Sequence, residues 1–240
     1  MRYTLNENFF EIPNLTNSYW AGFIAADGNL YQGSSKILQF GIHVKDRYIL
    51  EKFKEDIKST YPIKEANYNG KNHVRLRMSI SSKTWDDLYN IWSLHPRKTL
   101  NLLPPKLSNV QHQLAYIIGL IDGDGSICLC KYKNNYNLEY SRIKFTICGT
   151  KDIIEWCSNI LHNLENPKYK PFTIESNKNN TLYYIRCDKL RAQNLINKLL
   201  EVNIPWRLPR KWDLIKNLNS NEISTRKRYN KPPTSGGTPM

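Results

Sequence analysis

A nine-residue motif occurs twice in this chain, and each copy reads as an apolar helix with an internal glycine that ends in an acid and a second glycine. The copies are Trp20-Ala21-Gly22-Phe23-Ile24-Ala25-Ala26-Asp27-Gly28 and Ile117-Ile118-Gly119-Leu120-Ile121-Asp122-Gly123-Asp124-Gly125. Asp27 and Asp124 stand 97 positions apart, which is about the spacing expected of a duplicated half-domain. The repeat therefore predicts two structurally related halves.

The same order of elements follows each copy of the motif. Apolar and polar residues alternate over residues 38–44 and 143–147, and again over 74–80 and 183–187, which predicts half-buried strands. Helices are predicted over residues 45–57, 151–161, 85–92 and 195–199. Each half therefore reads α-β-β-α-β-β-α. This is an α+β fold in which helices cover one side of a four-stranded antiparallel sheet and leave its polar side open.

Two local signals describe the ends of these helices. Asp46 and Asp152 stand where predicted helices begin, and a carboxylate there can cap free backbone N–H groups. Gly28 and Gly125 follow the motif helices, at a position where the left-handed backbone conformation favours glycine. We therefore expect acidic N-caps and left-handed glycines at these places.

Proline content divides the chain. Residues 95–106 carry three prolines and lack an amphipathic period, which indicates a connection between the halves. The predicted organisation is a first half-domain over residues 1–94, a linker over 95–109, a second half-domain over 110–218 and a flexible basic tail over 219–240. The segment Leu208-Pro209-Arg210-Lys211-Trp212 either anchors the last helix or contacts a backbone phosphate, and the sequence leaves both open.

Composition favours an intracellular protein with a polyanionic partner. The 240 residues carry a formal net charge of +14, which points most simply to nucleic acid. The five cysteines form no C-x-x-C pair, so we expect reduced thiols in an organelle or in a microbial or phage-infected cytoplasm. No apolar run suggests a signal peptide or a membrane span, and we expect no membrane partner. ATP use and a histidine-metal nuclease are disfavoured, because the chain has neither a P-loop motif nor a histidine cluster.

The two motifs and the matching elements after them resemble the LAGLIDADG homing endonucleases, specifically the single-chain form with two motifs. The resemblance covers about residues 16–218. It implies a monomer in which the two curved sheets form a DNA-binding saddle. It also implies a nuclease that cuts both strands of a duplex with Mg²⁺.

The motif helices are expected to pack against each other. Gly22 and Gly119 lack side-chain bulk, so the two helices can approach closely at these positions. Such packing places Asp27 and Asp124 side by side at the helix ends, where two carboxylates repel each other and call for a cation. The glycine pair therefore predicts a helix interface and an acid pair at once.

The resemblance assigns roles to the acids. It implies that Asp27 and Asp124 bind a divalent metal, helped by the backbone carbonyls of Ala26 and Gly123, and oxygen ligands of this kind suit Mg²⁺. The earlier acid of the motif is Asp122 in the second copy, but alanine replaces it in the first. This position is not the expected metal ligand, so its loss makes the halves unlike without counting against activity.

Gln39 and Lys144 are the further catalytic candidates. Each precedes a phenylalanine, and alternation places each on the polar side of its predicted strand. Family members often carry Lys or Gln at about this point, where such a group positions water or stabilises charge that grows on the phosphate. We therefore expect both residues at the edge of the active site.

The open faces of the sheets also carry the side chains that we expect to contact DNA in the major groove. Arg75 and Arg77 are the best candidates for bidentate readout of guanine. The full set is Asn29, Tyr31, Gln32, Lys36, Arg75 and Arg77 in the first half, and Ser126, Cys128, Cys130, Tyr132, Arg142, Tyr184 and Arg186 in the second.

The leading hypothesis is thus a monomeric homing endonuclease that cuts a long, asymmetric duplex and is encoded within an intron. One alternative is an RNA-splicing maturase, which would make intron RNA a partner. Another is a DNA-binding regulator that has the same fold and does not cut. Retention of both motif acids argues against a pure maturase and against the regulator.

Overall fold

The computed structural model describes residues 3–68, 71–133, 137, 139–204 and 206–214. The predicted tail over residues 219–240 lies outside the described residues. The first half contains α1 (Leu15–Asp27), β1 (Gly28–Gln32), β2 (Lys36–His43), the 3-10 helix η1 (Val44–Asp46), α2 (Arg47–Asp56), β3 (Ile63–Tyr68), β4 (Lys71–Ser79) and α3 (Ser82–Asn90).

The second half repeats this order after a short 3-10 helix, η2 (Lys98–Leu100), in the connecting segment. The predicted α-β-β-α-β-β-α order is confirmed in both halves. Its elements are α4 (Val110–Gly123), β5 (Ser126–Lys133), β6 (Glu139–Gly149), α5 (Lys151–Leu164), β7 (Glu175–Ser176), β8 (Tyr183–Asp188) and α6 (Lys189–Leu200).

Each half forms its own antiparallel sheet. The strand orders are β1-β2-β4-β3 and β5-β6-β8-β7, so the two sheets have the same topology. Their strands alternate as predicted: Leu38, Phe40 and Ile42 are buried along β2, whereas Gly41 and His43 between and after them are exposed. The α+β prediction with two four-stranded antiparallel sheets is therefore confirmed.

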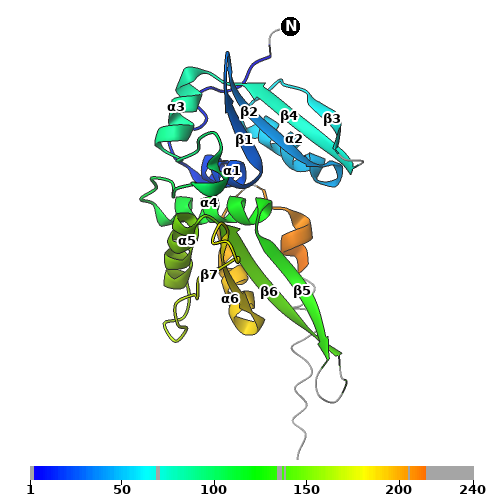
Figure 1. Ribbon diagram of the computed structural model, residues 1–240, viewed down its shortest axis with the longest axis vertical. Coiled ribbons are helices and arrows are strands. Elements are labelled where there is room, and N and C mark those ends of the chain that lie inside the picture. The colour runs from blue at the N-terminus through cyan, green and yellow to red at the C-terminus, as the bar shows by residue number, and fades with distance from the viewer. Residues whose placement is uncertain (1–2, 69–70, 134–136, 138, 205, 215–240) are drawn as a thin grey trace, which may run out of the picture.

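The motif helices α1 and α4 lie between the two sheets at the middle of the molecule (Figure 1). Residues 17–25 of α1 and 114–122 of α4 are all buried, side chains on every side of each helix included. A helix that is apolar all round belongs in a protein interior, which explains why the motifs carry no polar face. The two helices are therefore the shared core of both halves.

The connecting segment packs against the second half. Leu102 and Leu107 are buried, and the Thr150 hydroxyl donates a hydrogen bond of 2.5 Å to the Leu102 carbonyl oxygen. Thr150 is also the N-cap of α5, so one side chain fixes both the helix start and the connection. Among the described residues, no helix is long and apolar enough to cross a membrane.

The expected left-handed glycines are not found, and of the two expected acidic N-caps only Asp46 stands at an N-cap position, that of α2. Thr150 rather than Asp152 caps α5, and Asp46 precedes α2 without a side-chain capping bond, because its carboxylate pairs with Arg210. Gly28 has φ −80° and ψ 154°, and neither it nor Gly125 is left-handed. These positions need glycine because there is no room for a side chain. A Cβ atom would lie within 2.7 Å of the preceding helical turn at both positions.

Candidate active site and nucleic-acid interface

The crossing of α1 and α4 depends on the two motif glycines. A Cβ atom added at Gly22 would lie 1.9 Å from the Tyr116 carbonyl oxygen, and one added at Gly119 would lie 1.9 Å from the Tyr19 carbonyl oxygen. No side chain fits at such distances, so each glycine lets the backbone of the other helix come into direct contact. The equal distances show that the crossing is closely two-fold symmetric.

This crossing brings the two motif acids together. Asp27 is the last residue of α1, and Asp124 is the C-cap of α4. The Asp27 carboxylate lies beside the end of α4, because its Oδ2 is 3.4 Å from the place of a Cβ on Gly123. Both acid residues remain exposed to solvent at this point between the sheets.

The environment makes both acids harder to ionise. Partial removal from water, and after it the neighbouring Asp124 carboxylate, raise the pKa of Asp27 to about 6. Partial removal from water also raises the pKa of Asp124, and the ammonium groups of Lys98 and then Lys211 oppose that shift. The acid pair therefore carries negative charge that its surroundings compensate only in part.

Two lysines that the sequence analysis did not assign lie at this acid pair. Lys98 is 8% exposed and Lys211 is 6% exposed, although lysine is rarely buried. Desolvation lowers the pKa of Lys98 to about 8, while Asp124 and Asp27 oppose the shift. The sequence does hold a signal for them, since both lysines end a Pro-Arg-Lys tripeptide, at residues 96–98 and 209–211.

Lys211 caps the C-terminal end of α4. Its ammonium group donates hydrogen bonds to the carbonyl oxygens of Ile121 at 2.7 Å, Asp122 at 2.8 Å, Gly123 at 3.0 Å and Gly125 at 2.7 Å. The last carbonyls of a helix have no partner within the helix, and a cation there also offsets the helix dipole. The helix end that carries Asp124 is thus fixed by a residue far along the chain.

Asp122 holds the segment in which Lys211 lies. Its fully buried carboxylate accepts hydrogen bonds from the Tyr19 hydroxyl at 2.7 Å, the Leu208 backbone N–H at 2.9 Å and the Trp212 indole N–H at 2.6 Å. Burial raises the pKa of Asp122, and these hydrogen bonds oppose that shift. The sequence left open whether residues 208–212 anchor the last helix or contact a backbone phosphate. The structure answers this in part, because the segment is anchored on the second motif helix.

A metal at the acids would rely on oxygen donors. Among the described residues, no group of three or more His, Cys, Asp or Glu side chains could hold a metal ion. The donors present are the two motif carboxylates and the carbonyls of Ala26 and Gly123, of which the Gly123 carbonyl already accepts one bond from Lys211.

The charge balance at this point fits a divalent cation. Two carboxylates and two helix C-termini of about −0.5 each, set against two ammonium groups, leave a charge of about −1. Mg²⁺ is typically held by one or two carboxylates together with water and substrate phosphate, which matches this small donor set.

Gln39 and Lys144 do not occupy equivalent positions. Asn29 pairs with Gln39, whereas Ser126, which follows the second motif at the same offset, pairs with Thr146. Thr146 is therefore the counterpart of Gln39, and the alignment made from the sequence is two residues out of register. A slip of two residues keeps the same face, so the alternation pattern alone could not reveal it.

Lys144 also lies away from the acids. The Cys148 thiol donates to the Asp124 carbonyl oxygen at 3.3 Å, which marks where α4 meets β6. Lys144 is four residues from Cys148 along β6, about 13 Å at the usual rise of a strand. Gln39 lies nearer, next to Phe40, the cross-strand partner of Gly28. Among the described residues, the cations that lower the pKa values of the two motif acids are Lys98 and Lys211.

The open face of the first sheet carries a connected polar cluster. The Arg77 guanidinium donates to Gln39 Oε1 at 3.0 Å and lies 5.9 Å from the centre of the Tyr31 ring. The Asn29 amide donates to the Tyr31 hydroxyl at 2.7 Å. Arg75 and Arg77 are both exposed. These predicted DNA-contact residues therefore share one face and lie beside one another.

The second sheet presents a comparable face with two arginine–tyrosine stacks. Arg142 lies 4.9 Å from the centre of the Tyr132 ring, and Arg186 lies 4.4 Å from that of Tyr184. Arg186 also forms an ion pair of 3.3 Å with Glu175. The remaining candidates line β5, where Ser126, Cys128 and Cys130 pair with Thr146, Lys144 and Arg142.

Two predicted DNA contacts face the wrong side. The Lys36 ammonium group lies 3.8 Å from Asp86 and 5.6 Å from the centre of the Trp85 ring, both on α3. Gln32 is the cross-strand partner of Lys36 and has the same parity along the hairpin. Both residues therefore belong to the helix-covered side of the sheet. The alternation of β2 agrees with this placement, because Lys36 has the same parity as the buried Leu38, Phe40 and Ile42.

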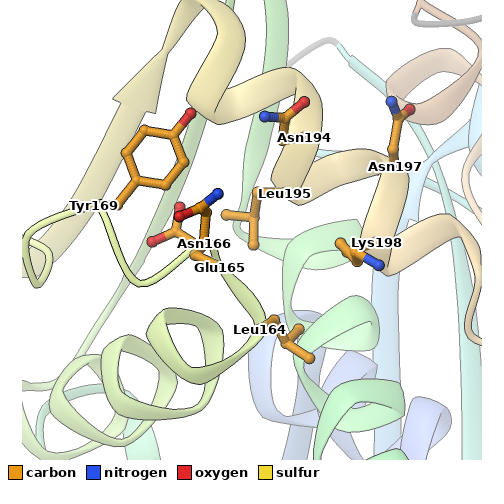
Figure 2. A pocket seen from close by; sticks show the side chains of 8 residues that line it. All are labelled: Leu164, Glu165, Asn166, Tyr169, Asn194, Leu195, Asn197 and Lys198. Carbon is orange, nitrogen blue, oxygen red and sulfur yellow. The ribbon is translucent and has the colours of Figure 1, made fainter.

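A pocket of about 240 Å³ lies elsewhere, between the C-terminal end of α5 and α6 (Figure 2). It contains no residue of either motif and no predicted site residue. Its lining residues are Leu164, Glu165, Asn166, Tyr169, Asn194, Leu195, Asn197 and Lys198.

Solved structures share this arrangement. Meganuclease I-SmaMI bound to uncleaveable DNA matches with a TM-score of 0.60 and 14% identity over 87% of this chain and 92% of that chain. The I-LtrWI LAGLIDADG homing endonuclease bound to target DNA matches with a TM-score of 0.56 and 12% identity over 90% and 92%. LAGLIDADG meganuclease I-AabMI bound to uncleaved DNA gives 0.59 and 12% over 86% and 90%.

This chain thus has the fold of the single-chain LAGLIDADG proteins, and the resemblance drawn from the motifs is confirmed at the level of the fold. No protein-family model and no curated protein matches the sequence.

Proposed function

We propose that this protein is a site-specific endonuclease that cuts both strands of a long DNA duplex by Mg²⁺-dependent phosphodiester hydrolysis. The observation that carries the proposal is the meeting of Asp27 and Asp124, one from each half, beside two buried lysines at the middle of the molecule. The neighbours of the same fold are meganucleases with DNA bound, which supports the same activity here.

The two sheets supply the DNA-binding surface. Their open faces carry Arg75, Arg77, Arg142 and Arg186, and the whole chain carries a formal net charge of +14. Arginine on such a face can contact phosphate or read guanine in the major groove. The unlike side chains on the two faces favour an asymmetric target, because the symmetry of a protein is mirrored in the symmetry of its site.

The residues at the centre suit phosphodiester hydrolysis. Asp27 and Asp124, with the carbonyls of Ala26 and Gly123, would hold the metal, which activates water and stabilises the leaving oxygen. The carboxylates must be ionised for this task, and their raised pKa opposes ionisation when no cation is bound. The site is therefore arranged to bind a cation strongly once both acids lose their protons.

The lysines supply fixed positive charge. A cation next to the reacting phosphate stabilises the negative charge that grows on it in the transition state. This effect is stronger in a site that is partly removed from water. Lys98, with its pKa lowered to about 8, can also give up or accept a proton near neutral pH. We propose that these two lysines supply the positive charge at the acids that was expected from Lys144.

We further propose that the protein is a monomer encoded within an intron, with the uninterrupted form of the host gene as its target. A single chain already contains both motifs and both sheets, so that one copy completes the site.

Cleavage selection on a randomised duplex library tests the function. The library is incubated with the protein in Mg²⁺, with Ca²⁺ and the Asp27→Asn/Asp124→Asn double variant as controls. The proposal expects one long consensus, cut with a fixed stagger in Mg²⁺ and left uncut by the double variant.

Other outcomes would overturn it. Enrichment of bound but uncut duplexes in Mg²⁺ would identify a DNA-binding regulator. No enrichment of any duplex, together with tight binding to intron RNA, would identify a maturase.

A further inference from the structure

We propose that Cys128 and Cys130 form a reversible disulfide that weakens DNA binding by the second sheet. The reactant that closes this disulfide is a small-molecule disulfide such as glutathione disulfide. The thiol chemistry depends on the protein alone, whereas the effect on DNA binding rests on the proposed function.

The two thiols lie against each other on the open face of the second sheet. Cys128 and Cys130 stand two residues apart on β5, so strand alternation places both side chains on one face. Their Sγ atoms are 3.7 Å apart, within the distance of a thiol–thiol hydrogen bond. Both residues are half-buried and neither takes part in a disulfide. A small reagent can therefore reach the pair from the side on which we expect DNA.

Strand geometry permits a disulfide at this place without a large movement. A rise of about 3.3 Å per residue sets the two Cα atoms about 6.6 Å apart, near the upper limit of the separations that disulfides span. The sulfurs must approach from 3.7 Å to about 2.05 Å. Among the described strands, β5 is at the edge of its sheet and pairs with β6 alone, so it can bend without breaking a second ladder.

The same geometry makes the bond easy to reverse. A disulfide at the stretched end of the range stores strain, and strained or exposed disulfides are the ones that are readily reduced. The loop that it closes is only residues 128–130, so it constrains the unfolded chain little and adds little stability. These properties suit a switch better than a structural disulfide.

No other thiol in the described part of the chain is placed to compete. Cys148 lies on the same face, but it is four residues beyond the cross-strand partner of Cys128 along β6, about 13 Å away. Cys157 is fully buried in α5, and Cys187 lies on the helix-covered side of β8. The reaction is therefore expected to select the pair on β5.

The pair stands among side chains that we expect to contact DNA. Cys128 and Cys130 are the cross-strand partners of Lys144 and Arg142. Arg142 in turn lies 4.9 Å from the ring centre of Tyr132, the next residue on this face of β5. Closing the disulfide bends β5, changes the spacing of these side chains and removes two S–H donors. Base contacts in a groove depend on such spacing, so the disulfide form should bind DNA more weakly.

The reaction balances in electrons and protons. One protein thiolate attacks a sulfur of glutathione disulfide and forms a mixed disulfide, and the glutathione thiolate that leaves takes up a proton. The second protein thiol loses its proton, attacks the protein sulfur of the mixed disulfide and releases the second glutathione. Two protein thiols are thereby oxidised by two electrons, and glutathione disulfide is reduced to two molecules of glutathione.

The first test uses the whole protein without DNA. The protein is equilibrated with mixtures of glutathione and glutathione disulfide, the remaining thiols are alkylated in denaturant, and tryptic peptides are read by mass spectrometry. Residues 107–131 form one tryptic peptide, so both thiols are read together. Partial burial, and after it the hydrogen bond with Cys130, raise the pKa of the Cys128 thiol, so the reaction is run at about pH 8.5 to supply thiolate.

The expected product is a peptide that carries neither alkyl group, weighs two hydrogen atoms less than the dithiol and is restored by dithiothreitol. In Cys128→Ser and in Cys130→Ser the remaining thiol should stop at the mixed disulfide with glutathione. A mixed disulfide that persists in the parent, or no oxidation in glutathione disulfide alone, would overturn the proposal. Equal oxidation of Cys148 or Cys187 at the same glutathione ratio would also overturn it, because that would mean unselective oxidation.

The second test measures binding of the labelled duplex recovered by the selection, in Ca²⁺, by fluorescence anisotropy. The disulfide form should bind at least about tenfold more weakly than the same sample after reduction with dithiothreitol, an effect of the size caused by one mismatched base pair. The Cys128→Ser/Cys130→Ser double variant, taken through the same treatment, should bind equally before and after reduction. Equal or tighter binding by the disulfide form of the parent would overturn the switch.

The two failures can be told apart. If the parent selects and cuts no duplex, the proposed function fails, and the peptide masses still decide whether the two thiols form a disulfide. If the parent cuts its duplex and the thiol pair does not close, the function stands and the switch fails.

Discussion

The helix crossing and the two lysine segments show opposite outcomes of the same duplication. At the crossing the halves match closely, because a Cβ atom added at Gly22 or at Gly119 would lie at the same distance, 1.9 Å, from a carbonyl oxygen of the other helix. At the lysines they differ, since Lys211 has four carbonyl partners and an acid-anchored segment, while Lys98 has neither among the residues that the structure describes. Symmetry is thus kept where two backbones touch.

The difference has a physical cause. Where backbones touch, any side chain beyond hydrogen is excluded, so both copies must keep glycine. Where a segment is held by side-chain hydrogen bonds, one substitution such as Ala for Asp removes the whole set and leaves the fold intact. The crossing therefore preserves the repeat, and the segments around it allow the halves to specialise.

The largest expected effect is on the symmetric crossing. Gly22→Ala and Gly119→Ala should each cost about 4 kcal/mol or more of unfolding free energy, because the helices cannot separate without unpacking the shared core. Chemical denaturation checks this, with Gly41→Ala as the control, since a Cβ there would meet nothing within 4 Å. A loss of unfolding free energy in one glycine variant and none in the other would contradict a symmetric crossing.

The lysine pair gives the next largest effect. Lys211→Met should cost about 2–4 kcal/mol and lower the melting temperature by about 5–15 °C, because buried carbonyls lose a charged donor. Lys98→Met is the matched control and should change stability little or raise it, since desolvation disfavours its charge. Equal losses in both variants would show that the two lysines are held alike.

A smaller effect concerns pH. Because the pKa of Asp27 is raised to about 6, its ionisation costs stability, so the stability of the parent should fall as pH rises from about 4 to 6 and then level off. Asp27→Asn should weaken this decline, to which Asp122 and Asp124 also contribute because their pKa values are raised too, and it should be about 1 kcal/mol more stable at pH 7 after allowance for solvent screening. Thermal unfolding in metal-free buffer at several pH values checks the sign. A parent that gains stability over this range would contradict the assigned environment of Asp27.

The smallest effect is expected at the ion pair between the halves. Arg210 binds both oxygens of Asp46, but its side chain is 56% exposed, and exposed ion pairs contribute at most about 1 kcal/mol. Arg210→Met should therefore change the melting temperature by no more than about 3 °C. A much larger loss would mean that Arg210, rather than Asp122, anchors the C-terminal segment.

Much of the fold could be predicted because the sequence repeats itself. The motif glycines, the alternating strands and the order of elements each depend on local spacing, which the residues record directly. The same local signals gave the acid pair. Lys36 could also be placed from the sequence, because alternation puts it on the same side of β2 as the buried Leu38 and Phe40.

The lysines could not be found by the repeat offset. Lys98 follows Asp27 by 71 residues, whereas Lys211 follows Asp124 by 87, because the second half has longer connections. Alignment at a fixed spacing therefore misses the pair, and the Pro-Arg-Lys tripeptide is the signal that finds it. The misalignment of Gln39 with Lys144 has a similar origin, since strand register depends on cross-strand pairing that the sequence of one strand does not record.

Single-turnover cleavage of the selected duplex by the parent, Asp27→Asn and Asp124→Asn, with binding measured in parallel, tests the central claim most directly. The account predicts that both variants bind the duplex about as well as the parent and that each cuts it more than about a thousandfold more slowly, because several kcal/mol of charge stabilisation depend on the acid pair. If either variant cuts both strands at the parental rate, the two halves do not share one active site at the ends of α1 and α4.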